Sequence, residues 1–394
     1  MSEEPPTKKA CPHGTAAASS KNEDSSKCPY SKDGSDLTYH SYLEIDRILS
    51  SQKPQTLVQT GKAAHDEMLF IIIHQTYELW FKQILWEVDS IREMFSKEVL
   101  SNSDMSTSVS RLRRVVEIQK VLVQQLTILE TMTSFSFLDF RDSLGTSSGF
   151  QSFQFRILEV RLGLKREKRM TYGRQPFCQA LGEDQREEIK QIEKEKSLFD
   201  LLDAWLCRMP CFTHEDFDFW AEYKKVIKEK FDQERKSVQQ NSKLSQDETE
   251  AAVKSIDHNE KGYSEFFDEE KYAKLLEEGR KRLSHKAAKA AIMINVYQEE
   301  PLFSLPFQLL QLVLDVDELM RTWRYKHALM VHRMLGMKVG TGGSSGYHYL
   351  KATASQHMVF SDFFDLSMFL IPRTMVPVLP DSFKRHFGYR FEHK

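Results

Sequence analysis

The apolar residues of this sequence recur three or four positions apart over long stretches, and they almost never alternate with polar residues in the two-residue period of a strand. In the stretch 65–95 this spacing links Tyr77, Phe81, Ile84, Val88 and Ile91. Similar stripes run through about 106–132 and through 307–336. Such spacing places side chains on one face of a helix. The pattern therefore predicts an all-α fold.

Length and charge predict how the chain is divided. With 394 residues, 40% of them hydrophobic, it exceeds the roughly 250–300 residues at which single cores stop growing. The first residues are rich in Ser, Lys, Glu and Pro, and a long middle segment is strongly charged. We expect a disordered tail (1–36), a first part of the helical core (37–182), a charged helical appendage (183–285), a second part of the core (286–380) and a C-terminal tail (381–394).

The composition also argues against several classes of protein. A formal net charge of -2 predicts neither a nucleic-acid partner nor binding to an anionic membrane. No apolar run approaches the roughly 20 residues of a transmembrane helix, and the N-terminus lacks the apolar segment of a secretory signal. Five cysteines in so long a chain do not form a disulfide framework. We expect a soluble, cytoplasmic protein.

His74 stands out in the apolar stretch LFIIIHQTYELWFKQIL. Phe70, His74 and Tyr77 fall on or near one helical face, so a core histidine and a ligand-facing histidine are both compatible with the pattern. His65 precedes His74 by nine positions, or about 900° at about 100° per residue, and lies on the opposite face. This helix therefore does not offer a pair of metal ligands.

Two further histidines lie on the predicted late helix. His327 and His332 are five positions apart and diverge by about 140°, so they cannot bind one ion together. His327 shares an apolar stripe with Trp323, and the surroundings of His332 are hardly more polar. An axial haem ligand needs only one histidine and a roomy apolar cavity. Spacing alone does not choose between the two.

Arg141 lies among aromatic residues in FLDFRDSL. A guanidinium in such a setting is suited to bind a carboxylate through two parallel hydrogen bonds. The alternative is a surface arginine that pairs with Asp139 or Asp142.

The loop GTGGSSG, from Gly340 to Gly346, follows a helix rather than a strand and lacks a GK[ST] sequence. A nucleotide site is therefore not expected. Its glycine-rich composition favours a mobile lid that becomes ordered around a polar ligand, with the Thr341 hydroxyl among the groups that contact it. The alternative is a simple connector between two helices.

Several motifs together resemble the tryptophan 2,3-dioxygenase family: HDEMLFIIIHQTYELWFKQILWEVDSIREMF, ILETMTSFSFLDFRDSL, SSGFQSFQFR, WRYKH and GTGGSSGYHYLKAT. The resemblance covers about Leu37 to Pro380 and is weakest in the charged appendage. It implies a helical bundle that holds one haem b per subunit. The implied reaction opens the indole C2=C3 bond of L-tryptophan with O2 to give N-formylkynurenine, the first step of the kynurenine pathway of tryptophan catabolism.

The resemblance also implies a role for each matching residue. His327, which closes W-R-Y-x-H, would be the axial ligand of the haem iron, and His74 would accept a hydrogen bond from the indole N–H. Arg141 would bind the substrate carboxylate. The further substrate-site residues would be Phe70, Ile71, Ile72, Phe137, Leu144, Ser148 and Thr341, and the haem would also contact Trp323, Phe70, His74, Gly340 and Gly342.

Assembly is implied in the same way. The family forms a homotetramer, a dimer of dimers, in which the segment 37–50 reaches a neighbouring subunit's site; the matching residues here are Tyr39, Tyr42 and Leu43. One departure concerns Phe137, where bacterial relatives have a tyrosine. A tyrosine hydroxyl at this position adds a hydrogen-bond donor to the site of the substrate carboxylate. Phe137 has no such hydroxyl, so Arg141 should contribute more to binding the carboxylate.

Two other readings remain open at this point. One is a cofactor-free helical scaffold that uses the charged appendage for docking. The other is the related indoleamine 2,3-dioxygenase family, but that family lacks a histidine at the position of His74.

Overall fold

The computed structural model describes residues 37–170, 178, 180–209, 213–214, 217–338 and 346–380. The predicted tails, 1–36 and 381–394, lie outside these residues, as do Gly340, Thr341 and Gly342. The chain divides into two compact units, Met1–Gln52 and Lys53–Lys394.

The first unit contains two short helices, α1 (Tyr39–Leu43) and α2 (Ile45–Leu49). Thr38 caps α1 and forms a capping box with Ser41, while Glu44 adopts a left-handed conformation (φ 52°) that separates the helices. Helices of one turn have no face wide enough to bury their apolar side chains. Tyr39 is 73% exposed and Tyr42 is 71% exposed. This unit therefore presents an uncovered apolar surface.

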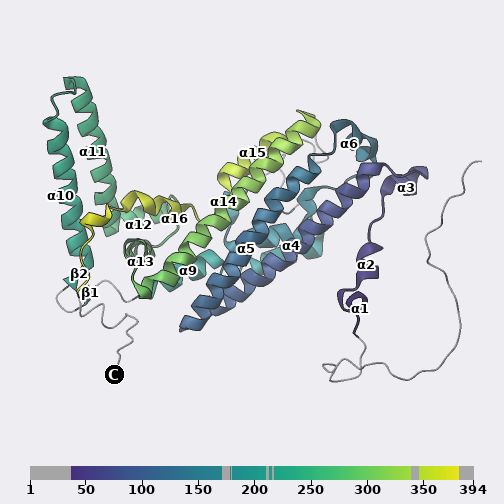
Figure 1. Ribbon diagram of the computed structural model, residues 1–394, viewed down its shortest axis with the longest axis horizontal. Helices are drawn as coiled ribbons and strands as arrows, with labels where there is room; N and C mark the ends of the chain where they lie inside the picture. Colours follow the sequence, from purple (N-terminus) through teal and green to yellow (C-terminus); the bar gives the residue numbers. More distant parts are fainter. Residues whose placement is uncertain are drawn as a thin grey trace, which may run out of the picture. The chain divides into compact units, whose positions relative to one another are not determined.

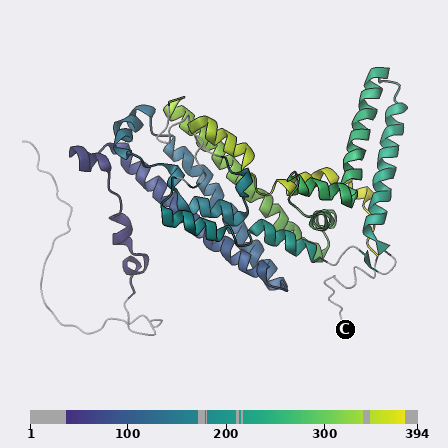
Figure 2. The same ribbon diagram turned by 180° about the vertical axis from the view of Figure 1, so that it is seen from behind.

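The second unit is built on three long helices, α4 (His65–Ser96), α5 (Asn102–Leu129) and α14 (Pro301–Leu335). α5 packs against both α4 and α14, and the three run side by side (Figure 1). α7 (Phe153–Leu162) packs on α4, and α15 (Gly346–Gln356) packs on α14. The same arrangement is seen from behind (Figure 2). The predicted all-α fold is confirmed.

The sequence explains these helices locally. The predicted stripe of α4 is buried along its whole length: Tyr77, Phe81, Ile84, Val88 and Ile91. Burying one such aliphatic or aromatic side chain contributes about 1.5–3 kcal/mol. At the N-terminus of α5, the Ser101 side chain accepts from the Asp104 amide. α14 begins with a proline at its first position, where no backbone N–H is needed.

Shorter elements connect the long helices. Glu67 of α4 accepts hydrogen bonds from the first amides of α3 (Gln55–Thr60), which fixes that helix to α4. The elements are α3 (Gln55–Thr60), α6 (Ser134–Arg141), η1 (Asp142–Leu144), η2 (Gly149–Gln151), η3 (Arg166–Lys168), α8 (Glu183–Ile192), α9 (Leu198–Cys207), α16 (Ser361–Asp365), η4 (Leu366–Phe369) and η5 (Arg373–Met375).

The charged segment forms a helical hairpin. α10 (Phe219–Gln239) and α11 (Gln246–Phe267) lie side by side in both views (Figure 1; Figure 2), followed by α12 (Glu269–Glu277) and α13 (His285–Val296). Two-residue strands, β1 (Thr213–His214) and β2 (Phe217–Asp218), form a short antiparallel ladder at its start. The hydroxyl of Tyr223 donates to the Phe369 carbonyl at 2.7 Å, and that of Tyr263 to the Leu370 carbonyl at 3.2 Å. These two hydrogen bonds anchor the C-terminal segment to the hairpin. The expected domain boundaries at 182/183 and 285/286 remain predictions. No helix in the described ranges is both long and apolar enough to cross a membrane.

Candidate active site

A cavity of about 600 Å³ opens between α4, α5, α6, α7, α14 and α15. Its walls are mainly apolar and aromatic, with Phe70, Phe137, Phe155, Leu126 and Met330 among the lining residues. A few polar groups converge on it, which is the usual composition of a ligand site.

His74 enters this cavity from α4. Its Nδ1 lies 2.7 Å from the Phe70 carbonyl, one turn earlier, so Nδ1 carries the proton and Nε2 keeps its lone pair. The Phe70 ring lies 4.1 Å from the imidazole, centroid to centroid. Burial lowers the pKa of His74, and the Phe70 hydrogen bond and the charge of Glu78 offset this only in part. The imidazole is accessible because it faces the cavity, and it is held as a neutral acceptor.

His327 enters from α14 and lines the same cavity. It stacks on Trp323, with 5.2 Å between ring centroids and an interplanar angle of 21°. Burial lowers the pKa of His327 to about 4, and the nearby His74 acts in the same direction. Its Nδ1 is buried and has no hydrogen-bond partner within the described part of the chain. A neutral imidazole is the form that binds a metal.

The structure separates the two late histidines that helical spacing could not distinguish. His332 stacks on Tyr347 at 4.3 Å and is not among the residues that line the cavity. Of these two histidines, His327 is therefore the one that faces the cavity among the residues that the structure describes.

Arg141 is the last residue of α6 and lines the cavity together with Phe137, Leu144 and Ser148. Thr133 caps the start of α6 by accepting from the Ser136 amide. The rings of Phe70 and Phe137 lie 6.0 Å apart, so apolar side chains of α4 and α6 surround this part of the cavity. The predicted guanidinium among aromatic residues is present at the cavity wall.

Other predicted residues lie elsewhere. Ile71 and Ile72 are not among the lining residues, and Ile72 is 43% exposed, because each step along the helix turns the side chain by about 100° away from Phe70. Tyr39, Tyr42 and Leu43 belong to the separate first unit. The roles expected for these residues remain predictions.

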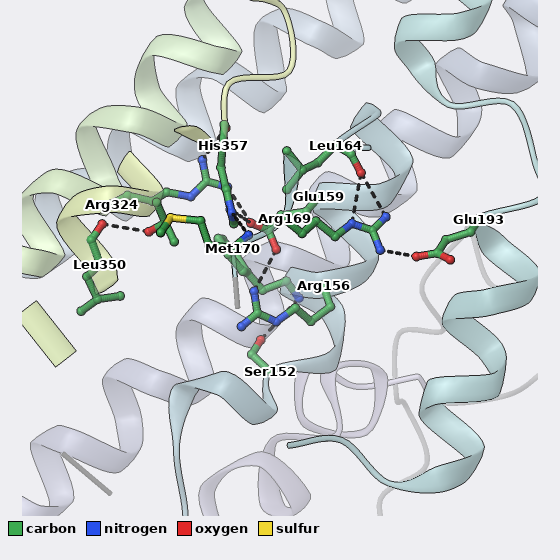
Figure 3. A network of polar contacts seen from close by, with 12 residues as sticks. Ser152, Arg156, Glu159, Leu164, Arg169, Met170, Glu193, Arg324, Leu350 and His357 are labelled. Atoms are coloured by element: carbon green, nitrogen blue, oxygen red, sulfur yellow. Dashed lines mark hydrogen bonds and ion pairs between the residues drawn. The ribbon is translucent and has the colours of Figure 1, made fainter. Parts of the chain in front are cut away.

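Sequence reasoning missed a buried polar network at the cavity wall (Figure 3). It consists of Arg156 and Glu159 of α7, Arg324 of α14 and His357 after α15, and all of them line the cavity. The only signals in the sequence were an arginine and a glutamate three positions apart in the apolar FQFRILEVRL, and the arginine of WRYKH.

The residues present fit a haem. The group needs an apolar cavity, one neutral imidazole facing the iron and cations near its two propionate carboxylates. The cavity is lined by the His327 imidazole, whose buried Nδ1 has no hydrogen-bond partner among the described residues, and by Arg156 and Arg324, whose side chains are buried at its wall. Its mainly apolar lining suits a flat hydrophobic ring.

Comparison with known proteins agrees with this chemistry. A family profile described as tryptophan 2,3-dioxygenase matches residues 23–370. The tryptophan 2,3-dioxygenase of Bdellovibrio bacteriovorus is 44% identical over 353 residues, which cover 90% of this chain and 98% of the relative. That of Mus musculus is 46% identical over 343 residues, covering 86% and 84%, and that of Dictyostelium discoideum 43% over 352 residues, covering 89% and 88%. The chain belongs to the tryptophan 2,3-dioxygenase family.

Proposed function

We propose that this protein cleaves the indole C2=C3 bond of L-tryptophan with O2 to give N-formylkynurenine, as the first step of the kynurenine pathway. The observation that carries the proposal is one apolar cavity that His74 of α4, His327 of α14 and Arg141 of α6 line together, with both of these histidines neutral. Family membership supports the same reaction.

One haem b per subunit is part of the proposal. His327 would hold the iron, and Arg156 and Arg324 would lie near the propionates. When bound, haem supplies the iron that activates O2. The protein's part is to bind and orient the substrate and to exclude water from the cavity.

The substrate groups have matching partners in the cavity. The Arg141 guanidinium would bind the carboxylate of tryptophan, and the rings of Phe70 and Phe137 would pack against the indole. His74 Nε2 would accept from the indole N–H, because Nδ1 is committed to the Phe70 carbonyl. The indole N–H is a very weak acid, so His74 orients the ring rather than removing its proton.

Replacing His74 by alanine should leave haem content unchanged and lower kcat/KM for L-tryptophan about tenfold. This is the loss expected from one hydrogen bond of about 1–1.5 kcal/mol. Steady-state kinetics with 1-methyl-L-tryptophan, which lacks the N–H, provides the control, since the variant should lose little on that substrate. If His74→Ala emptied the protein of haem, the residue would instead have a structural role.

We also propose a cytoplasmic homotetramer, a dimer of dimers, in which the segment 37–50 completes a neighbouring subunit's site. The exposed Tyr39, Tyr42 and Leu43 support this, because apolar side chains on such short helices gain stability only when something covers them.

The proposed function has a direct test. Haem-loaded protein is reduced without O2, L-tryptophan is added and the absorption spectrum is recorded; O2 is then admitted and N-formylkynurenine is measured. We expect a haem spectrum, a tryptophan-induced change and product that depends on O2. A colourless protein that takes up no haem would favour the scaffold alternative, and equal turnover of D-tryptophan or tryptamine would favour an indoleamine 2,3-dioxygenase.

A further inference from the structure

Glu159 of α7 is the centre of the buried network at the cavity wall (Figure 3). Its Oε2 accepts from Arg156 Nη1 at 3.0 Å, and its Oε1 accepts from Arg324 Nη2 at 2.7 Å. His357 Nδ1 lies 3.3 Å from the same Oε1. One carboxylate therefore has three partners, and all four side chains are buried.

The network joins segments that are far apart in the chain. Arg324 lies on α14 three residues before His327, and it also donates from Nη1 to the His357 carbonyl at 3.0 Å. His357 follows α15, and its Nε2 accepts from the Met170 amide at 3.1 Å. Since Nε2 is an acceptor, Nδ1 carries the proton and donates to Glu159. A neutral His357 thus ties the end of α15 to α7 and α14.

Charge adds a second property to this network. Burial opposes ionisation of Glu159, but the His357 hydrogen bond and the charges of Arg156 and Arg324 outweigh it, so the pKa of Glu159 lies far below its usual range. The carboxylate is therefore charged at neutral pH. It offsets one of two buried guanidinium charges at the wall of the cavity.

We propose that Glu159 is a positioning residue for the proximal side of the site, which holds the His327-bearing turn of α14 against α7 and α15 and sets the charge around the cofactor. Residues three apart on a helix are neighbours on its surface, so fixing Arg324 also fixes the backbone that carries His327. The effect of Glu159 on the charge around the cofactor rests on the proposed haem function. Its effect on the position of α14 does not depend on haem.

The chain offers a matched control in Glu87 of α4. This carboxylate is also buried, accepts from Arg114 Nη1 at 2.6 Å and from Gln83 Nε2 at 2.7 Å, and is not among the residues that line the cavity. Glu159→Gln and Glu87→Gln each remove one buried negative charge. Both variants should therefore lose stability to a similar extent.

The positioning effect is measured on the full chain without haem, by amide hydrogen exchange. Glu159→Gln should speed exchange in α14 around 320–330 and at the end of α15 by at least tenfold, whereas Glu87→Gln should act on α4 and α5. Unchanged protection of α14 and α15 in Glu159→Gln would overturn the positioning role. This readout needs no haem, so it stands even where the proposed function fails.

The charge effect is measured on the haem-loaded protein by titrating the ferric and ferrous forms. Removing the Glu159 charge leaves the cavity wall more positive, which favours the ferrous state. At a fixed applied potential the ferrous-to-ferric ratio should rise on the order of tenfold in Glu159→Gln and stay constant in Glu87→Gln. An equal ferrous-to-ferric ratio in Glu159→Gln and Glu87→Gln would contradict the charge effect and leave Glu159 with a structural role only.

Glu159→Asp separates the two effects and serves where Glu159→Gln does not fold. It keeps the charge and withdraws the carboxylate by one methylene. We expect haem transfer to an excess of a haem acceptor protein to become several-fold faster, with little change in the ferrous-to-ferric ratio. Haem loss at the wild-type rate would contradict the positioning role.

Discussion

Replacement of His327 by alanine is expected to abolish stable haem binding. The imidazole lines the apolar cavity as a neutral group, and its Nδ1 has no partner among the described residues. Losing a residue that merely orients a metal ligand costs about 10–100-fold in metal affinity, so losing the ligand itself should exceed a hundredfold. The measurement is the haem-to-protein ratio after reconstitution and gel filtration, read from the pyridine haemochrome spectrum.

His332→Ala is the matched control for this experiment. It removes a histidine from the same helix, five positions further on, that stacks on Tyr347 and does not line the cavity. This variant should keep full haem content and an unchanged ferric spectrum. Far-UV circular dichroism should show that both variants retain their helices. A His327→Ala protein with normal haem content would transfer the ligand assignment to another residue.

The contrast between these histidines shows where sequence periodicity stops being informative. The stripe from Tyr77 to Ile91 predicted a buried helical face, and the structure buries each of its five residues. The same reasoning placed both His327 and His332 on apolar faces, because a helical wheel describes only one helix. Which apolar face borders a cavity depends on α4, α7 and α15, and these come from distant parts of the chain.

The network around Glu159 was hidden for the same reason. Its members come from α7, α14 and the segment after α15 (Figure 3). In the sequence, Arg156, Glu159 and Arg324 look like charged residues on the surfaces of amphipathic helices. Periodicity reports burial of apolar residues, whereas a buried ion pair appears only when its partner is known. The charged appendage shows the same limit of sequence patterns. Its helices were predicted and are present, but the pattern did not predict that Tyr223 and Tyr263 anchor the C-terminal segment.

Replacement of Arg141 by alanine is expected to lower kcat/KM for L-tryptophan by about a hundredfold, mainly through KM. A bidentate charged pair contributes two hydrogen bonds of about 1.5–3 kcal/mol each, part of which water would replace. Phe137, which also lines the cavity, has no hydroxyl that could donate a hydrogen bond to the carboxylate in place of Arg141. The same variant should change turnover of tryptamine little, because tryptamine keeps the indole and lacks the carboxylate.

The two substrates together decide whether Arg141 binds the carboxylate or only supports the fold. A structural defect lowers kcat/KM for L-tryptophan and tryptamine by the same factor, since both need an intact cavity around His74 and Phe70. Loss of a carboxylate partner acts on L-tryptophan alone, and Arg141→Lys should then recover part of the loss, because an ammonium keeps the charge but not the paired donors. Equal factors for the two substrates, with no recovery by lysine, would refute carboxylate binding by Arg141.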